Sequence, residues 1–344
     1  MDLVTHVLLG AVCAGAVTAQ TVNAQKELRL RMTVTAVAAV FPDIDYLSFW
    51  LDPLVFLADW HRTATHSFLL MPVWAGLLGS LFMLFRPARA RWRSVYGLCA
   101  LGITTHLLLD LMTVFGIRIF YPASEAHYSF GTTFIIDLIT TSILAVVLFH
   151  FLRRHRRSVA LSGMALIIMY WGIQWVLKTQ AHTIAADQVT VAAHVYALPQ
   201  PFSPFYWKLI RRSEDSYEVA YLSLLADETG LLTLYRGPKA LHWRQYSLLG
   251  SNIGLHSMVR EAWQHHRFNK FRSFAQFPVL YRVDQEESTT CVWFTDMRYT
   301  LPFIQPAFRY GMCKNIDSPW HLYRLKRFTD NERQLLPEAE LSLD

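Results

Sequence analysis

Long apolar stretches constrain this chain more than any other feature of its sequence. A helix needs about 20 apolar residues to cross the roughly 30 Å hydrocarbon core of a bilayer, and six stretches in the first half come near that length. Inside lipid their backbone groups have no water to bond, so we expect the stretches to be helices. The six predicted spans lie near residues 3–22, 30–47, 66–85, 94–115, 134–152 and 159–177.

Charged residues are divided unevenly between the two halves of the chain. Only 17% of the 344 residues are charged, whereas soluble domains carry about 25%. Residues 1–177 contain 13 basic and 9 acidic residues, and residues 178–344 contain 19 and 17. The apolar excess therefore lies in the first half. Most of the net charge of +6 comes from arginines clustered between apolar stretches, so we expect a membrane as the partner and no nucleic acid.

The loops between the predicted spans alternate in charge. Three turns together carry eleven lysines and arginines, whereas the two intervening loops carry one arginine each, Arg62 and Arg118. Basic loops stay in the cytoplasm, so we predict a multi-pass plasma-membrane protein with both termini and the two longer loops outside. The basic turns are residues 23–31, 86–93 and 153–157, and the other loops are residues 42–65 and 116–133.

The second half of the chain has a different pattern. From about residue 180 apolar and polar residues alternate with the period of two that is typical of strands, and residues 254–271 fit an amphipathic helix. We therefore predict an α-helical membrane bundle of about six transmembrane helices (residues 1–178) followed by a smaller soluble α+β domain outside the membrane (residues 179–344). The predicted strands are residues 189–198, 217–225, 231–235, 279–283 and 291–296.

Four cysteines are divided equally between the two regions. Cys13 and Cys99 lie inside predicted membrane helices, where we expect them to pack as small apolar side chains. Cys291 and Cys313 both lie in the exported domain. A disulfide between them would add stability on the order of 3 kcal/mol, and the sequence leaves open whether it forms.

Ionisable residues interrupt the apolar segments near one surface. Such residues are costly in a bilayer and usually have a function. In the predicted topology the start of the first span, the end of the second, the start of the third, the end of the fourth and the start of the fifth all lie at the outer surface. His106 and Asp110 are four residues apart and share a helix face. The residues that meet at this level are His6, Asp43, Asp45, His61, His66, His106, Asp110 and Asp137.

Imidazoles together with carboxylates, and without thiolates, are typical ligands of Zn²⁺ or a related divalent metal ion. Seven or eight candidate ligands exceed one tetrahedral coordination sphere. We therefore expect one to three ions and favour two, with an aspartate bridging them. Asp137 is expected to be either a ligand or an acceptor of a hydrogen bond from a ligand.

Four motifs follow one another along the first half of the chain. They are Met1-Asp-Leu-Val-Thr-His6 followed by Leu8 and Gly10, then Phe41-Pro-Asp-Ile-Asp45, His61-Arg-Thr-Ala-Thr-His-Ser67 and His106-Leu-Leu-Leu-Asp110. As an ordered set they resemble the bacterial membrane-bound metal-dependent hydrolases, YdjM-like, also described as LexA-binding inner membrane-associated hydrolases, and the likeness covers about residues 1–150. The resemblance implies a helical bundle in the inner membrane and a hydrolase of unspecified substrate.

The order of these motifs is also distantly similar to zinc-dependent phospholipase C and the related single-strand nucleases. Those enzymes are helical and bind three zinc ions, so this similarity implies phosphoester hydrolysis. The chain lacks their amino-terminal Trp ligand and part of their His-rich tail, which puts a site with three metal ions in doubt.

Our leading hypothesis is metal-dependent hydrolysis of a phosphoester, in a lipid or lipid-linked substrate, at the outer face of the membrane. Asp45 and His66 are expected to act in the reaction, and Arg62 to pair with a phosphate oxygen. Two alternatives remain. The same residues could form a path for a metal ion or proton, although a path needs polar groups at several depths. They could also hold a structural metal in a non-catalytic scaffold, where zinc sites are usually closed and mononuclear.

Overall fold

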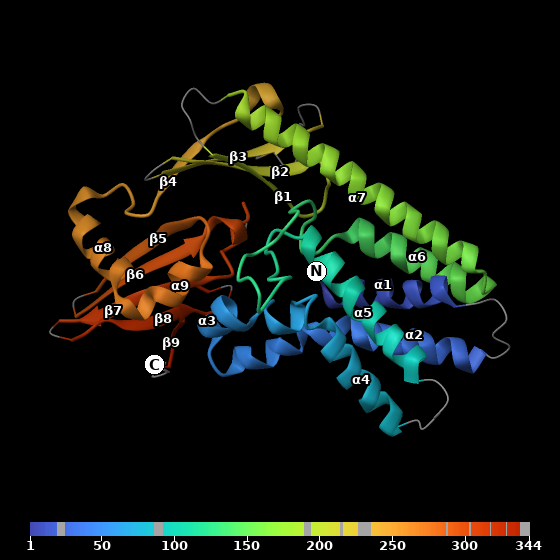
Figure 1. Ribbon diagram of the computed structural model, residues 1–344. Helices are drawn as coiled ribbons and strands as arrows, with labels where there is room; N and C mark the ends of the chain where they lie inside the picture. Colours follow the sequence, from blue (N-terminus) through green and yellow to red (C-terminus); the bar gives the residue numbers. More distant parts are fainter. Residues whose placement is uncertain are drawn as a thin grey trace. The chain divides into compact units, whose positions relative to one another are not determined.

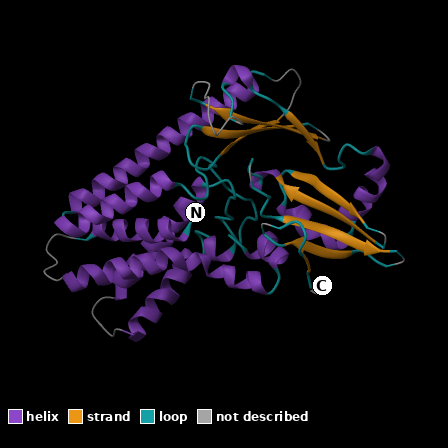
Figure 2. Cartoon of the chain, turned by 180° about the vertical axis from the view of Figure 1, so that it is seen from behind, coloured by secondary structure: helices purple, strands orange, loops and turns teal. Residues whose placement is uncertain are grey.

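The chain folds into two compact units in the computed structural model. The helical unit comprises Met1–Leu47, Trp60–Thr183 and Leu198–Trp207, and the sheet unit comprises Ser48–Asp59, Ile184–Ala197 and Lys208–Asp344. Figures 1 and 2 show the helices and strands from opposite sides. The structure describes residues 1–18, 25–85, 92–188, 194–213, 216–225, 235–286, 288–302, 304–316, 318–327 and 329–337.

Helices make up most of the helical unit. Local side chains set several of their ends: Asp2 accepts a hydrogen bond from the backbone of Thr5 at the start of α1, and Asp137 does the same for the start of α6. Such caps satisfy amides that have no partner inside the helix. The elements are α1 (Leu3–Val17), α2 (Gln25–Val40), the 3₁₀ helices η1 (Phe41–Trp50) and η3 (Ala64–His66), α4 (Met71–Phe85), α5 (Trp92–Met112), α6 (Leu138–Arg154) and α7 (Arg157–Ala186).

Two apolar cores hold these helices together. One joins α1 to α6 and α7 through buried side chains such as Val12, Leu144 and Ile167. The other joins α2, α4 and α5 through side chains such as Ala75 and Ile103. Buried Cys13 and Cys99 carry free thiols and belong to these two cores, which confirms their predicted packing role.

Fewer helices can cross a membrane than the sequence predicted. Among the described residues three are long and apolar enough, Gln25–Trp50, Trp92–Met112 and Arg157–Ala186. A fourth crossing results if Pro53–His66 and Met71–Leu84, which meet at a bend of 75°, count as one span. The prediction of six spans is not supported, because the helices in two predicted spans are too short. With 15 and 17 residues, α1 and α6 extend only about 22 Å and 26 Å.

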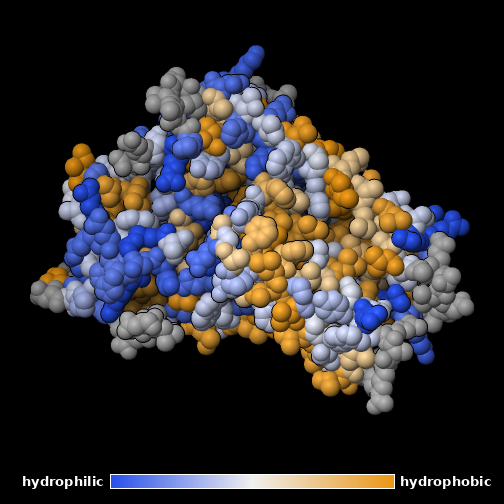
Figure 3. Space-filling view, in the orientation of Figure 1, coloured by the Kyte–Doolittle hydropathy of each residue, from blue (hydrophilic) through white to orange (hydrophobic). Residues whose placement is uncertain are grey.

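Apolar side chains face outward on the helical unit. On α7, Ile168, Ile173 and Val176 are exposed, and on α4 Leu77 and Leu84 are exposed. Figure 3 shows hydrophobic side chains over much of this unit's surface. Extended apolar surfaces of this kind are unusual on soluble monomers and are typical of contact with lipid.

Two antiparallel sheets form the framework of the sheet unit and of the segment that leads into it. Their strand orders follow the sequence, β1-β2-β3-β4 and β5-β6-β7-β8-β9. The strands are β1 (His194–Pro199), β2 (Tyr206–Arg212), β3 (Ser216–Ser223), β4 (Arg244–Ser247), β5 (Pro278–Gln285), β6 (Thr289–Asp296), β7 (Arg309–Asn315), β8 (His321–Leu325) and β9 (Arg333–Leu335).

Three short helices accompany the sheets: α3 (Pro53–Val55), α8 (His256–Gln264) and α9 (Asn269–Phe274). The single amphipathic helix predicted over 254–271 is thus divided, since α8 ends at Gln264 and His265 has an extended backbone. His265 then caps the next turn by accepting a hydrogen bond from the backbone of Arg267.

Predicted and observed strands agree where apolar and β-branched residues are dense. Strands β1, β3, β5 and β6 overlap four predicted strands. Residues 231–234 of the fifth, and 189–193 of the first, lie outside the described residues. Strand β2 was not predicted because its sequence, Tyr-Trp-Lys-Leu-Ile-Arg-Arg, places a lysine and an arginine among buried residues instead of alternating.

A disulfide joins Cys291 and Cys313. These residues lie directly opposite each other in the register of β6 and β7, so the sheet itself brings the two thiols together. The possibility that the sequence left open is therefore realised.

Candidate metal centre

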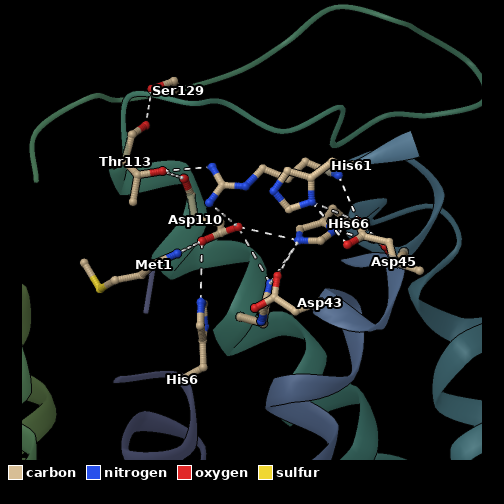
Figure 4. A network of polar contacts seen from close by, with 12 residues as sticks. Met1, His6, Asp43, Asp45, His61, His66, Asp110, Thr113 and Ser129 are labelled. Atoms are coloured by element: carbon tan, nitrogen blue, oxygen red, sulfur yellow. Dashed lines mark hydrogen bonds and ion pairs between the residues drawn. The ribbon is translucent and has the colours of Figure 1, made fainter. Parts of the chain in front are cut away.

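Four side chains from three separate elements of the helical unit meet in one small region. Asp43 comes from η1, His66 from η3, and His106 and Asp110 lie one turn apart on α5. One ligand atom from each lies within 4.8 Å of the others. The side chains of His66, His106 and Asp110 are fully buried, whereas that of Asp43 is 27% exposed. Figure 4 shows Asp43, His66 and Asp110 pointing toward one another.

Two glycines allow the helices that carry the histidines to approach α2. A Cβ atom at Gly10 on α1 would lie 2.9 Å from Ala39 Cβ, and one at Gly102 on α5 would lie 2.4 Å from the carbonyl oxygen of Thr35. Each glycine is one helical turn from a histidine, Gly10 from His6 and Gly102 from His106. Close packing on α2 therefore places these two rings together, and they stack with centroids 3.8 Å apart.

The distances within the group match the coordination sphere of one small cation. The Nε2 atoms of His66 and His106 are 3.0 Å apart. Asp43 Oδ1 is 3.6 Å from each of them, and Asp110 Oδ2 is 3.5 Å and 3.7 Å away. Ligand atoms about 2.0–2.1 Å from a tetrahedral zinc ion are about 3.3 Å from one another. The arrangement therefore fits a divalent metal ion held by two imidazoles and two carboxylates.

Hydrogen bonds on the far side of each ring fix which nitrogen faces the group. His106 Nδ1 donates to the backbone carbonyl of Ala39 at 2.7 Å. Thr65 donates its hydroxyl hydrogen to Asp45 Oδ2, so its oxygen accepts from His66 Nδ1 at 3.0 Å. In a neutral ring the other nitrogen then carries a lone pair. Two lone pairs thus face each other at Nε2, an arrangement that a cation between them would stabilise.

Asp45 lies behind the histidines and outside the four-residue group. Its carboxylate accepts hydrogen bonds from the backbone of Arg62 at 3.0 Å and from His61 Nδ1 at 3.1 Å, and lies 3.5 Å from His66 Nδ1. A carboxylate in this position orients a metal-binding imidazole and raises its basicity. The structure therefore places predicted ligands Asp45 and His61 beside the group.

His6 lies on the opposite side of Asp110. Its Nε2 is 3.5 Å from Asp110 Oδ1, the oxygen that also accepts from the amino nitrogen of Met1. The ring is fully buried, yet neither of its nitrogens makes a hydrogen bond to the described residues. The two oxygens of Asp110 thus face different partners, as expected of a carboxylate that could bridge two ions.

Arg62 places a positive charge beside this carboxylate. Its guanidinium is 3% exposed and pairs with Asp110 Oδ2 at 3.0 Å, while another of its nitrogens donates to Thr113 Oγ1 at 3.0 Å. It also lies over the ring of Phe115, 4.7 Å from the centroid. Its Nε is buried and has no hydrogen-bond partner within the described part of the chain, so one donor of the guanidinium is left unsatisfied.

Asp137 has a different position and role. Its carboxylate accepts from the backbone of Ile139 and Thr140 and from the Tyr170 hydroxyl, so it caps α6 and does not join the group. Sequence reasoning missed Thr113, whose hydroxyl holds Arg62, and Gly102, and it noted Gly10 only as part of a motif. The glycines had a signal: each lies four residues from a histidine, on the same helix face.

Comparisons with known proteins agree with the sequence motifs. A family model described as YdjM inner membrane protein matches residues 1–181, a range that contains every residue of the group. No curated protein and no solved structure matches the chain. The family match and the three candidate spans support an inner-membrane location.

Proposed function

The chain belongs to the YdjM inner membrane protein family, and from this premise and the His/Asp group we propose that it is a metal-dependent hydrolase embedded in the membrane. Its substrate would be a phosphoester in a lipid or lipid-linked molecule. One observation carries the proposal. Two imidazole lone pairs and two carboxylates lie together in a buried region, and a divalent cation between them would match their charge.

His66, His106, Asp43 and Asp110 would hold the ion, and zinc suits this mixture of nitrogen and oxygen ligands. His6 and the second oxygen of Asp110 supply ligands for a further ion, which is why we favour two. A divalent ion at this site supplies Lewis-acid chemistry, lowering the pKa of water and neutralising charge on a phosphoryl oxygen.

The surrounding residues prepare the site for an anionic substrate. Asp45 and Thr65 hold His66 in one orientation, and the Ala39 carbonyl does the same for His106. Arg62 is held by Asp110 and Thr113, and its remaining Nε–H would donate to a phosphoryl oxygen. Because Asp43 is the member of the four-residue group with a partly exposed side chain, the substrate would approach from its side.

Orientation in the membrane follows from the basic turns. Eleven of the basic residues between the predicted spans lie in turns at 23–31, 86–93 and 153–157, and such turns stay in the cytoplasm. The candidate spans Gln25–Trp50 and Trp92–Met112 begin at two of these turns and carry Asp43, His106 and Asp110 near their other ends. We therefore place the metal group on the extracytoplasmic side, so the substrate would be reached from the outer leaflet.

Metal analysis of the purified protein, combined with an activity panel, tests this function. The wild type should contain at least one equivalent of zinc or a similar divalent metal, and His66→Ala and His106→Ala should lose it. His150→Ala is the matched control, because this histidine is exposed at the end of α6. The panel should include phosphomonoesters, phosphodiesters and lipid phosphates. Metal-dependent release of phosphate or alcohol that disappears in His66→Ala supports a hydrolase.

A structural metal site in a non-catalytic scaffold is the second candidate, since four protein ligands can complete a tetrahedron. Replacing the native metal with Co²⁺ distinguishes the two. A hydrolase needs an open position, so its cobalt spectrum should change when phosphate or vanadate is added. An unchanged tetrahedral spectrum, together with no activity on any ester, would favour the scaffold.

A further inference from the structure

A cavity of about 410 Å³ lies inside the sheet unit, away from every residue of the metal group. Both sheets contribute to its walls. Tyr221 comes from β3, Tyr246 from β4 and Tyr281 from β5, and the segment after β6 completes the lining. A cavity of this volume is within the range of pockets that hold small organic ligands.

Three basic side chains line the cavity. They are Arg236, His242 and Arg244, and no acidic residue is among the described residues of the lining. All three are exposed to solvent. Within the described ranges neither guanidinium has an ion-pair partner, whereas the neighbouring Arg211 pairs with Glu218 at 3.4 Å. Two unpaired guanidiniums at one cavity are typical of a site for phosphate or carboxylate, which arginine binds through two parallel hydrogen bonds.

The walls between these charges are aromatic and apolar. The Tyr281 hydroxyl already donates to Asp330 at 2.9 Å. The ring of Tyr221 lies edge-to-face with that of Tyr235, with centroids 5.7 Å apart, and Lys208 Nζ is 5.6 Å from the Tyr221 ring centroid. Rings held in this way can present a face to a ligand body without losing much conformational freedom. Pro302 and Pro306 add rigid apolar surface to the lining.

A buried lysine holds the turn after β6, which lines part of the cavity. Lys208 on β2 donates from Nζ to the carbonyl of Met297 at 2.9 Å and to Thr300 Oγ1 at 2.8 Å. Met297 and Thr300 both line the cavity. A buried ion pair between Arg298 and Asp296, at 2.7 Å, stabilises the same turn. The cavity is therefore built on a rigid polar framework that ties one sheet to the other.

We propose that this cavity binds a small organic anion, in which a phosphate or carboxylate meets Arg236 and Arg244 and a compact body such as a sugar packs between the tyrosines. This site is separate from the metal group, so the proposal does not depend on hydrolase activity. It assigns the sheet unit a role in recognising a ligand.

Isothermal titration of the purified full-length protein in lipid nanodiscs tests the proposal. The probes are glucose 6-phosphate, glucuronate, neutral glucose and inorganic phosphate, all in EDTA so that the metal group does not contribute. At least one of the two anionic sugars should bind at least tenfold more tightly than glucose and than inorganic phosphate. Arg236→Ala and Arg244→Ala should each weaken that binding at least tenfold.

Arg260→Ala is the matched control, because Arg260 is an exposed arginine on α8 outside the cavity lining. It removes the same charge and should leave binding unchanged. The proposal would be overturned by no binding of either anionic sugar, by equal binding of glucose, or by equal weakening in Arg260→Ala. Inorganic phosphate that binds as tightly as glucose 6-phosphate would also overturn it, because the tyrosine walls would then contribute nothing.

Discussion

His66 Nε2 and His106 Nε2 face each other at 3.0 Å, and the other nitrogen of each ring is already bonded to an oxygen. The two histidines come from segments 40 residues apart in the sequence. The carboxylates of Asp43 and Asp110 lie on either side of this pair, within 3.7 Å of both nitrogens. A divalent cation between these two nitrogens and two carboxylates would be stabilised by both pairs of groups, which is the basis of the metal proposal.

Close packing at Gly102 should affect metal binding, although Gly102 is not itself a member of the metal group. In Gly102→Ala the new Cβ would overlap the Thr35 carbonyl at 2.4 Å, so α5 must move away from α2. We expect a loss of roughly 1–3 kcal/mol in stability, typical of overpacking, and a metal content well below that of the wild type. Elemental analysis and thermal unfolding measure the two effects.

Gly97→Ala on the same helix is the control for this change. A Cβ at Gly97 has no neighbour within 4 Å, so the substitution should keep the metal and leave stability equal or higher, by up to about 1 kcal/mol. Equal metal loss in both variants would show that the approach of α5 to α2 does not position His106.

Asp45 should strengthen metal binding without touching the ion. Asp45→Asn keeps the shape of the side chain but removes the charge that orients His66 and His61. We expect affinity for Zn²⁺ to fall 10- to 100-fold, the usual effect of losing a carboxylate behind a histidine ligand. Competition with a chelator of known affinity gives the number.

Asp137→Asn separates the role at the metal site predicted for Asp137 from the helix-capping role that the structure shows. Asparagine caps helices about as well as aspartate, so α6 should keep its start. Zinc affinity should then equal that of the wild type. If zinc affinity fell as much as in Asp45→Asn, Asp137 would belong to the metal site, and its assignment as a cap would be contradicted.

Arg62 should affect catalysis more than metal binding. Arg62→Lys keeps a positive charge near Asp110 but loses the planar fork that can bind two partners at once. If the chain hydrolyses phosphoesters, we expect kcat/KM to fall at least about tenfold while metal content stays within error. An Arg62→Lys variant with unchanged kcat/KM would mean that the guanidinium only stabilises the fold.

Stability of the sheet unit should depend on pH through Lys208. Burial lowers the pKa of Lys208 to about 7 from its ordinary 10.5, although the Asp296 carboxylate raises it. Between pH 7 and 10.5 the unfolded chain therefore binds a proton that the folded chain lacks, so the free energy of unfolding should rise with pH in that window. This contribution is complete above pH 10.5 and is lost progressively as the pH falls from 10.5 to about 7.

Hydrogen exchange of peptides from β2, measured between pH 7 and 9 and corrected for intrinsic exchange rates, tests this dependence. The rise in protection with pH should be absent in Lys208→Met, which removes the titrating group. Lys314→Met is the control, because Lys314 is on β7 and its Nζ is 3.3 Å from the exposed Glu261. A rise that persists in Lys208→Met would assign the effect to another group.

The sequence predicted the meeting of the histidines and aspartates because each motif stands at the end of an apolar segment. The sequence could not distinguish residues that face the metal position from residues that only contact those ligands. Asp43 and Asp45 are two residues apart and chemically identical, yet only the 3₁₀ turn of η1 decides which one faces His106. Asp137 at a helix start has the sequence pattern of either a ligand or a cap.

The number of spans was overestimated for a similar reason. Hydropathy reports how apolar a segment is, but not where its helix begins. Before α4, the Ser67 hydroxyl accepts from the backbone of Leu69 and Leu70, and the helix starts only at Met71. In the sheet unit, strand β2 was not predicted because it contains Lys208. The groups that Lys208 bonds, on Met297 and Thr300, are about 90 residues away in the sequence, so the local sequence does not show that this lysine is buried.

X-ray absorption spectroscopy of the zinc-loaded full-length protein tests the central claim most directly. The spectrum should show only nitrogen and oxygen ligands near 2.0–2.1 Å, with the outer scattering of two or three imidazoles from His66, His106 and His6. His106→Gln should lose one imidazole. Sulfur scattering, or an absence of imidazole scattering, would contradict the claim that these histidines and aspartates form a metal centre.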